Sequence, residues 1–313
     1  MLNKTIVGNL GNQLFQYAAL RGIQRKLYPN EGINLSFASE NYKTGEKRVY
    51  PNHLADLSLK PYSVSEVIHP SGIQRLLTGA VGCEIQLCWR GETGIAAKRA
   101  IQHTVELRRQ KLLNRFGVYQ MQDGYYPFAV SSAREKHFFG YFESEKYFSH
   151  IRDELLAEFT PTHAPLAENV DLYRRIAETE SVCISVRRGD FVGTSIDDYA
   201  NICGADYFAH AMERMRTLCP NAVWFFFSDD IEWVKQAIPF DGTAFYERGT
   251  DPGWEKLRLM SSCKHFIISN SSFSWWAQYL SDNPNKIVLA PSQWRRNSAR
   301  PDIYQANWEL IEV

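Results

Sequence analysis

The sequence predicts an α/β protein in which helices cover parallel sheets and the chain forms two domains. Short strands alternate with helices through the second half, and these strands are apolar on both faces, as buried parallel strands are. The first residues show the same order once, as strand, glycine-rich loop and helix. A chain of 313 residues is long enough for two such domains.

The second half supports this prediction element by element. A β-branched run predicts a strand at 182–187, and the apolar residues of 206–219 have helical spacing. Further strands are predicted at 222–227, 243–247, 265–269 and 286–290, and further helices at 231–238, 254–263 and 270–280. Strands that alternate with helices in this way are typical of βαβ units, which build parallel sheets.

The first half begins in the same way. A strand precedes Gly8 and Gly11, which permit a tight turn, and a helix follows them. Further elements are predicted at 32–37 (strand), from 138 (strand) and at 150–159 (helix), whereas no element is assigned between 38 and 130. Because a proline-bearing linker follows the last helix, we place the domain boundary there, giving domains 1–165 and 166–313.

Composition excludes several classes of protein. Lys and Arg together equal Asp and Glu together, 35 each, so a general nucleic-acid coat is not expected. None of the six cysteines forms a C-x-x-C pair, so neither a zinc site nor a disulfide framework is expected. The first residues lack the apolar core of a secretory leader, and no stretch resembles a membrane span. We therefore expect a cytoplasmic protein.

Polar residues gather after three of the predicted strands. They are Arg187, Arg188 and Asp190, then Ser228, Asp229 and Asp230, then Asn270, Ser271 and Ser272. Because open parallel sheets bind ligands at the carboxyl ends of their strands, these residues predict one site. Two adjacent arginines can bind a diphosphate, although an ion pair between one arginine and Asp190 would also explain them.

Two other motifs fit an anion site, and each has a structural explanation. In GNLGNQ the glycines serve a turn, while Asn12 and Gln13 add polar groups at the start of a helix. In NSSFSWW a helix begins directly after a strand, and its free N–H groups attract anions, although Ser271 or Ser272 could simply cap the helix. The chain has no D-x-D sequence, so arginines would neutralise a diphosphate without metal.

The stretch from Lys98 to Arg115 is basic, with six Lys or Arg residues against one Glu. A solvated helix face is the first interpretation. The second is a peripheral contact with anionic lipid at the inner membrane.

Taken together, these motifs resemble the bacterial α-1,2-fucosyltransferases of glycosyltransferase family 11. The resemblance is carried by GNLGNQLFQYA, GYFESEKYF, SVRRGDF, FFFSDDIEWVK, LMSSCKHFIISNSSFSWWAQYL and NPNKIVLAPSQW, with a weak match from about 40 to 135. It implies a GT-B-like fold, with two Rossmann-like domains whose parallel sheets face a cleft. The first domain would bind the acceptor, and the second would bind GDP-sugar.

The resemblance also implies an activity: inverting, metal-independent transfer of L-fucose from GDP-fucose to the 2-hydroxyl of galactose. The acceptor would be an oligosaccharide or a lipid-linked glycan, with no cofactor beyond the donor. The predicted catalytic residues are Arg188, Asp190 and Arg187, with Arg188 ranked first and Asp197, Asp198 and Glu143 as further candidate bases. The predicted donor-binding residues are Gly11, Asn12, Gln13, Ser185, Arg187, Arg188, Asp229, Asp230, Asn270, Ser271, Ser272 and Phe273.

The chain departs from the family at Ser185, where a histidine is usual. Three functions therefore stay open: a fucosyltransferase, an enzyme that uses another GDP-sugar or a protein acceptor, and a non-catalytic protein that binds a sugar nucleotide or a glycan. Turnover with a panel of donors and acceptors would separate them.

Overall fold

The chain folds into two compact units. The computed structural model describes residues 1–40, 46–70, 72–189, 191–238, 240 and 242–313. The first unit comprises Met1–Phe159 and Pro301–Ile303, and the second comprises Thr160–Arg300 and Tyr304–Val313. The division between Phe159 and Thr160 lies in the same linker as the boundary predicted after residue 165.

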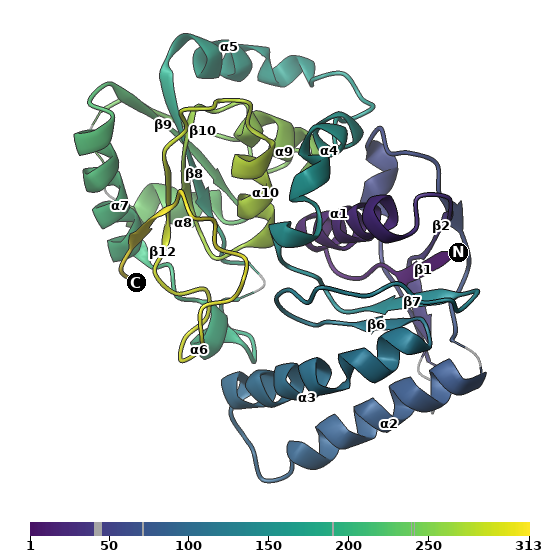
Figure 1. Cartoon of the computed structure of the whole chain (residues 1–313). Helices are drawn as coiled ribbons and strands as arrows, with labels where there is room; N and C mark the ends of the chain where they lie inside the picture. The colour runs from purple at the N-terminus through teal and green to yellow at the C-terminus, as the bar shows by residue number, and fades with distance from the viewer. Residues whose placement is uncertain (41–45, 71, 190, 239, 241) are drawn as a thin grey trace. The chain divides into compact units, whose positions relative to one another are not determined.

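The first unit is a parallel sheet with helices around it (Figure 1). Its strands are β1 (Leu2–Thr5), β2 (Ile33–Ser36), β5 (Ser63–Val64), β6 (Val118–Gln120) and β7 (Lys136–Phe139), in the order β5-β2-β1-β7-β6. A small antiparallel pair joins β3 (Ala38–Glu40) and β4 (Lys47–Val49). The helices are α1 (Leu10–Leu27), α2 (Gly72–Cys88), α3 (Ile95–Arg115) and α4 (Arg152–Glu158), with short 3-10 turns at His53–Asp56, Glu145–Tyr147 and Ser149–Ile151.

The strand order reverses between β1 and β7. From β1 the chain goes outward through β2 to β5, and β6 and β7 then lie on the other side of β1. The loops after β1 and β7 therefore leave the sheet in opposite directions, which opens a crevice at their carboxyl ends.

Gly22 lies in helix α1, at the place where this helix packs against the backbone of Tyr147 and Phe148. A Cβ built on Gly22 would lie 2.1 Å from the carbonyl oxygen of Tyr147, so no side chain fits there. We expect Gly22→Ala to lower the free energy of unfolding by about 1–3 kcal/mol in urea titrations. Gly79→Ala is the matched control: it lies in helix α2 with no atom within 4 Å of its Cβ, and should raise stability by about 0.5–1 kcal/mol. Equal effects in both variants would contradict this packing argument.

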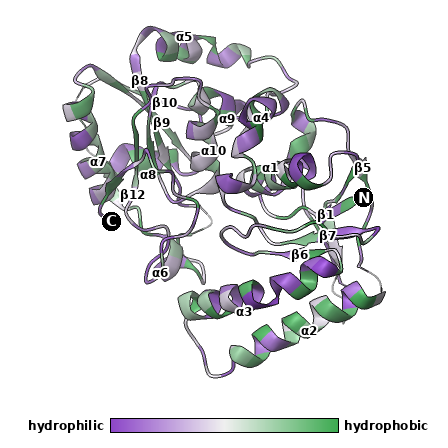
Figure 2. Cartoon of the chain, viewed as in Figure 1, coloured by the Kyte–Doolittle hydropathy of each residue, from purple (hydrophilic) through white to green (hydrophobic). Residues whose placement is uncertain are grey.

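Helices α2 and α3 occupy much of the segment that the sequence left unassigned. They pack together around Val81, Ile85 and Val105. Figure 2 shows hydrophobic residues along much of α2, and several of them, including Leu76, are exposed. The basic stretch predicted as a helix face lies on α3, where Arg109 pairs with Glu84 of α2 at 2.8 Å. Part of its charge is thus neutralised within the unit.

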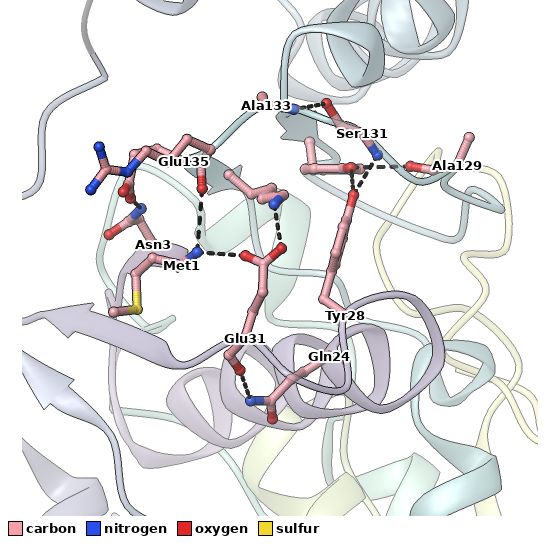
Figure 3. Close-up of polar contacts among 12 residues, drawn as sticks. Met1, Asn3, Gln24, Tyr28, Glu31, Ala129, Ser131, Ala133 and Glu135 are labelled. Carbon is pink, nitrogen blue, oxygen red and sulfur yellow. Dashed lines mark hydrogen bonds and ion pairs between the residues drawn. The ribbon is translucent and has the colours of Figure 1, made fainter.

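A polar cluster joins the amino ends of β1 and β7 to the end of α1 (Figure 3). The carboxylate of Glu31 pairs with Lys136 and with the amino group of Met1. The hydroxyl of Tyr28 accepts the N–H of Ser131 at 2.7 Å. The buried charge of Lys136 therefore has a counter-ion.

Three residues from near the end of the chain complete the first unit. The Asp302 carboxylate accepts the N–H of Tyr125 at 3.1 Å and pairs with the Lys146 ammonium at 2.7 Å. Ile303 is buried. The segment that leads to the last strand of the second unit thus passes through the first.

The second unit is a six-stranded parallel sheet in the order β10-β9-β8-β11-β12-β13. Its strands are β8 (Glu180–Val186), β9 (Ala222–Ser228), β10 (Ala244–Tyr246), β11 (His265–Ile268), β12 (Val288–Pro291) and β13 (Glu309–Ile311). Its helices are α5 (Val170–Glu178), α6 (Asp197–Ala200), α7 (Ala205–Leu218), α8 (Ile231–Ala237), α9 (Gly253–Ser261) and α10 (Ser272–Leu280), with a 3-10 turn at Ala167–Asn169. Strand pairings are parallel throughout this sheet.

This topology is that of a Rossmann-like sheet, so the prediction of an α/β fold with two parallel sheets is confirmed. Taken from β8, the strand order is 3-2-1-4-5-6, and it reverses between β8 and β11. Helices α7 and α8 cover one face, where Phe208 and Phe226 are buried, and α9 and α10 cover the other, where Trp275 is buried (Figure 1). Among the helices described, none combines the length and the apolar character that crossing a membrane requires.

Candidate functional site

A cavity lies at the carboxyl end of β8, where the strand order of the second sheet reverses. Its volume is about 180 Å³. It is lined by Ser185, Val186, Arg187, Phe227, Ser228, Asp229, Asp251, Gly253, Lys256, Met260, Ser271, Phe273 and Ser274. These residues lie at or after the carboxyl ends of β8, β9, β10 and β11, so the strand ends that the sequence singled out converge here.

Arg187 lines this cavity and is held by Asp229. Its guanidinium Nη1 lies 2.6 Å from Asp229 Oδ2. The same carboxylate accepts the N–H of Arg188 at 2.9 Å and the N–H of Gly189 at 3.0 Å. Asp229 therefore fixes both the turn after β8 and the Arg187 guanidinium, which fits a positioning role better than direct contact with a ligand.

Arg188 has a different environment. Its guanidinium carbon lies 3.8 Å from the centre of the Trp233 ring, and its Nε lies 3.2 Å from Asp230 Oδ2. Asp230 also caps α8 by accepting the N–H of Trp233 at 3.2 Å. Arg188 is thus packed onto α8, and it is Arg187 that reaches the cavity.

Ser185 lines the cavity on the same strand as Arg187. Its hydroxyl is 2.7 Å from that of Ser274, which lies 3.2 Å from the hydroxyl of Ser269. Side chains two residues apart on a strand point to the same face, which places Ser185 and Arg187 together. Ser185 therefore ends a buried chain of three hydroxyls.

The start of α10 forms one wall of the cavity. The hydroxyl of Ser271 caps this helix by accepting the N–H of Phe273 at 3.3 Å, and both residues line the cavity. The N-terminus of a helix carries partial positive charge, which favours an anion. Asn270 instead braces the surrounding loops, because its buried amide donates to the carbonyls of Ala200 and Trp294 at 2.8 and 3.0 Å.

Sequence reasoning missed Lys256, a second cation at the cavity. Its Nζ lies 2.7 Å from Glu247 Oε1 and donates to the carbonyl of Ser228 at 3.3 Å. The Glu247 side chain is fully buried, so it holds the ammonium firmly. The only signal in the sequence was a lysine on an amphipathic helix, a pattern that surface lysines share.

The glycine loop belongs to the first unit. Gly8 has a φ of +80°, which favours glycine. The buried amide of Gln13 donates to the carbonyls of Gly8 and Pro51 at 2.9 and 2.7 Å and accepts the N–H of His53 at 3.2 Å. These contacts use the Gln13 amide to hold the loop in shape. Gly11 and Asn12 lie in the first turn of α1.

Of the candidate bases, the structure describes the surroundings of Asp197 but not those of Asp190. Asp190 lies outside the described residues, so its predicted role stays a prediction. Asp197 accepts the N–H of Gly193 at 2.6 Å and the amide of Asn201 at 3.0 Å. The hydrogen bond from Gly193 contributes most to lowering the pKa of Asp197, which makes its carboxylate a weaker base.

Among the described residues, one cluster of potential metal ligands was found, formed by Glu180, Cys219 and His265. Its contacts do not suit a metal ion. The Nδ1 atom of His265 accepts the N–H of Ile287 at 3.1 Å, so Nε2 carries the ring proton. That nitrogen faces Glu180 Oε2 at 3.5 Å and offers no lone pair. The Glu180 carboxylate also pairs with Lys264 at 3.0 Å. The cluster is better explained by these polar contacts.

Known proteins resemble this chain in sequence. An α-1,2-colitosyltransferase of Escherichia coli is 34% identical over 163 residues, which is 50% of this chain and 55% of that protein. The chain thus spans about half the length of this relative. The O-antigen biosynthesis glycosyltransferase WbnK of Escherichia coli is 22% identical over 96% of this chain and 97% of its own length. A mouse galactoside 2-α-L-fucosyltransferase is 29% identical over 46% of this chain and 41% of its own length.

A solved structure shares the fold, and a family profile matches the sequence. The α-1,6-fucosyltransferase NodZ, whose structure is known from Bradyrhizobium, has a TM-score of 0.50 with 12% identity, over 92% of this chain and 94% of that chain. This likeness confirms the GT-B-like fold class. The profile of Glycosyl transferase family 11 matches residues 119–312, which is more than half of the chain. The protein therefore belongs to glycosyltransferase family 11.

Proposed function

We propose that this enzyme transfers L-fucose from GDP-fucose to the 2-hydroxyl of a galactose residue in a glycan, with inversion and without metal. The observation that carries the proposal is the cavity after β8, where two cations, Arg187 and Lys256, each held by a carboxylate, lie with the start of α10. That arrangement suits a diphosphate. The names of the relatives, a colitosyltransferase and fucosyltransferases that act on galactosides, support the sugar and the linkage.

In the proposed reaction the acceptor oxygen attacks C1 of fucose from the face opposite the nucleotide. The bond from C1 to the β-phosphate oxygen breaks, and its electron pair leaves with GDP. Negative charge therefore grows on that phosphate, where Arg187 and Lys256 would stabilise it. Both cations are already positioned, by Asp229 and by Glu247, so little reorganisation is needed. The acceptor proton passes to a carboxylate, for which Asp190 stays our first candidate, or to water.

A second donor, one that carries colitose, is favoured by the 34% identity to the colitosyltransferase. Fucose and colitose transfer would use the same nucleotide contacts and differ only around the sugar. Transfer of another sugar, transfer to a protein acceptor, and binding of the donor without turnover are the remaining alternatives.

Turnover of GDP-fucose with galactosides is expected to continue at an unchanged rate in excess EDTA, because protein cations replace the metal. The assay crosses several GDP-sugars with a panel of galactosides, both neutral and acidic, and methylation analysis of the product gives the linkage. Loss of activity in EDTA that Mn²⁺ or Mg²⁺ restores would refute metal independence. Binding of GDP-fucose without turnover on any acceptor would refute the proposed reaction.

A further inference from the structure

The first unit has a cavity of its own, at the point where its strand order reverses between β1 and β7. Its volume is about 270 Å³. It is lined by Lys4, Thr5, Val7, Ser39, Ile68, His69, Gln122, Phe138, Phe139, Gly140 and Tyr141. The carboxyl ends of parallel strands at such a reversal are where open sheets bind ligands. None of the residues considered so far as contacts of the donor lies among them.

The lysine in this cavity has no counter-ion among the residues described. Lys4 is only 3% exposed, and its Nζ donates to the carbonyl oxygen of Thr5 at 3.1 Å. Its other close neighbour is the Phe142 ring, whose centre lies 5.5 Å away. Lys136, the other buried lysine of this sheet, instead pairs with Glu31. Burying an ammonium group without a counter-charge is strongly unfavourable, so a lysine kept in this state is a candidate for binding a ligand.

The other groups around the cavity favour an anion. The titratable side chains that line it besides Lys4 are His69 and Tyr141, and burial raises the pKa of Tyr141, so its hydroxyl keeps its proton. Thr5, Ser39 and Gln122 add neutral hydrogen-bond donors. No carboxylate appears among these lining residues. A negatively charged group that enters the cavity would meet Lys4 and several donors. Glu143 and Asp123, which help to raise the pKa of Tyr141, are not among the lining residues.

We propose that this cavity binds a sugar unit that carries a carboxylate, as part of the acceptor glycan, and that Lys4 pairs with the carboxylate. The proposal rests on the proposed function only for the statement that the ligand belongs to an acceptor. Lys4 is then a residue that determines specificity, because it selects acidic sugars over neutral ones.

Proton uptake on binding follows from the proposal. Burial lowers the pKa of Lys4 from 10.5 to about 7, so above neutral pH the empty cavity holds mostly the neutral amine. A bound carboxylate favours the ammonium form and draws a proton from solution. Because only the protonated site is competent, affinity should fall roughly 30-fold between pH 6 and pH 8.5.

The test compares methyl galacturonide with methyl galactoside, which differ only in a carboxylate at C6. Binding to the intact chain is followed by ligand-observed NMR without donor, at pH 6 and pH 8.5. We expect methyl galacturonide to bind at least 10-fold more tightly than methyl galactoside at pH 6, and to lose this preference at pH 8.5. Lys4→Met should abolish the preference, whereas Lys26→Met, which removes an exposed charge from α1, should retain it.

Each result decides the proposal. Equal binding of the two sugars, or a preference that survives in Lys4→Met, would overturn it. So would binding of galactose 1-phosphate in place of methyl galacturonide, since that would assign the cavity to phosphate. Because the assay contains no donor, it is independent of the proposed transfer. Lys4-dependent binding without turnover would leave the carboxylate site standing, and it would remove the proposed function together with the statement that the ligand belongs to an acceptor.

Discussion

Replacing Arg187 with alanine is expected to lower the kcat of sugar transfer by about 30- to 1000-fold, which corresponds to about 2–4 kcal/mol of transition-state stabilisation. Arg187 lines the cavity after β8, and Asp229 holds its guanidinium at 2.6 Å. The loss should appear mainly in kcat, because charge on the leaving phosphate is greatest in the transition state. Steady-state kinetics with GDP-fucose, alongside circular dichroism to confirm folding, measures it.

Arg188→Ala is the matched comparison. Its guanidinium stacks on Trp233 and pairs with Asp230, so its removal should affect the stability of the turn more than kcat. The sequence analysis ranked Arg188 above Arg187. Sequence position alone, however, does not show which of two adjacent arginines faces a cavity. If Arg188→Ala loses more kcat than Arg187→Ala, this arrangement of the two arginines does not represent the catalytic state. Arg187→Lys should recover only part of the activity, since an ammonium group cannot bind a phosphate in a bidentate manner.

Replacing Lys4 with methionine is expected to raise the free energy of unfolding at pH 7 by on the order of 4 kcal/mol. The physical reason is that folding buries an amine that prefers to be charged. Its pKa is lowered from 10.5 to about 7 by burial, so folding at pH 7 either keeps a poorly solvated ammonium or releases its proton. Methionine fills similar space and carries no charge. Guanidinium titrations of both proteins measure the difference.

The difference in free energy of unfolding between the wild type and Lys4→Met should depend on pH. Between about pH 7 and pH 10.5 the unfolded chain binds a proton on Lys4 and the folded chain does not. The wild-type stability therefore gains with rising pH relative to the variant, and the difference between them should shrink from pH 7 to pH 9.5. Lys26→Met, on the surface, should show no such trend. A difference that stays constant with pH would mean that packing, and not charge, sets the effect.

The sequence predicted the frame of the second unit well, for physical reasons. Buried parallel strands need apolar residues on both faces, so β8, β9 and β11 stand out as continuous runs. Residues just after such strands converge at one edge, which is why the sequence alone groups Arg187, Asp229 and Ser271 into one site. The resemblance to the family then added the GT-B-like architecture to this α/β prediction.

The remaining features depend on tertiary contacts that no local pattern carries. Helix α3 is polar around much of its surface, so the spacing of its apolar residues did not predict a helix that packs against α2. Lys256 resembles any surface lysine until Glu247 is seen to be buried beside it. Lys4 was treated as part of a strand, because burial of a lone lysine is rare and is visible only once β7 and Phe142 surround it.

The return of residues 301–303 to the first unit affects how the protein is made. The ribosome releases residues 1–159 long before it synthesises Asp302, which supplies the contacts to Tyr125 and Lys146. At about 5–20 residues per second, translation from residue 160 to residue 300 takes on the order of ten seconds. During that interval the emerging first unit must persist without its last segment, so its maturation during synthesis is coupled to completion of the second unit.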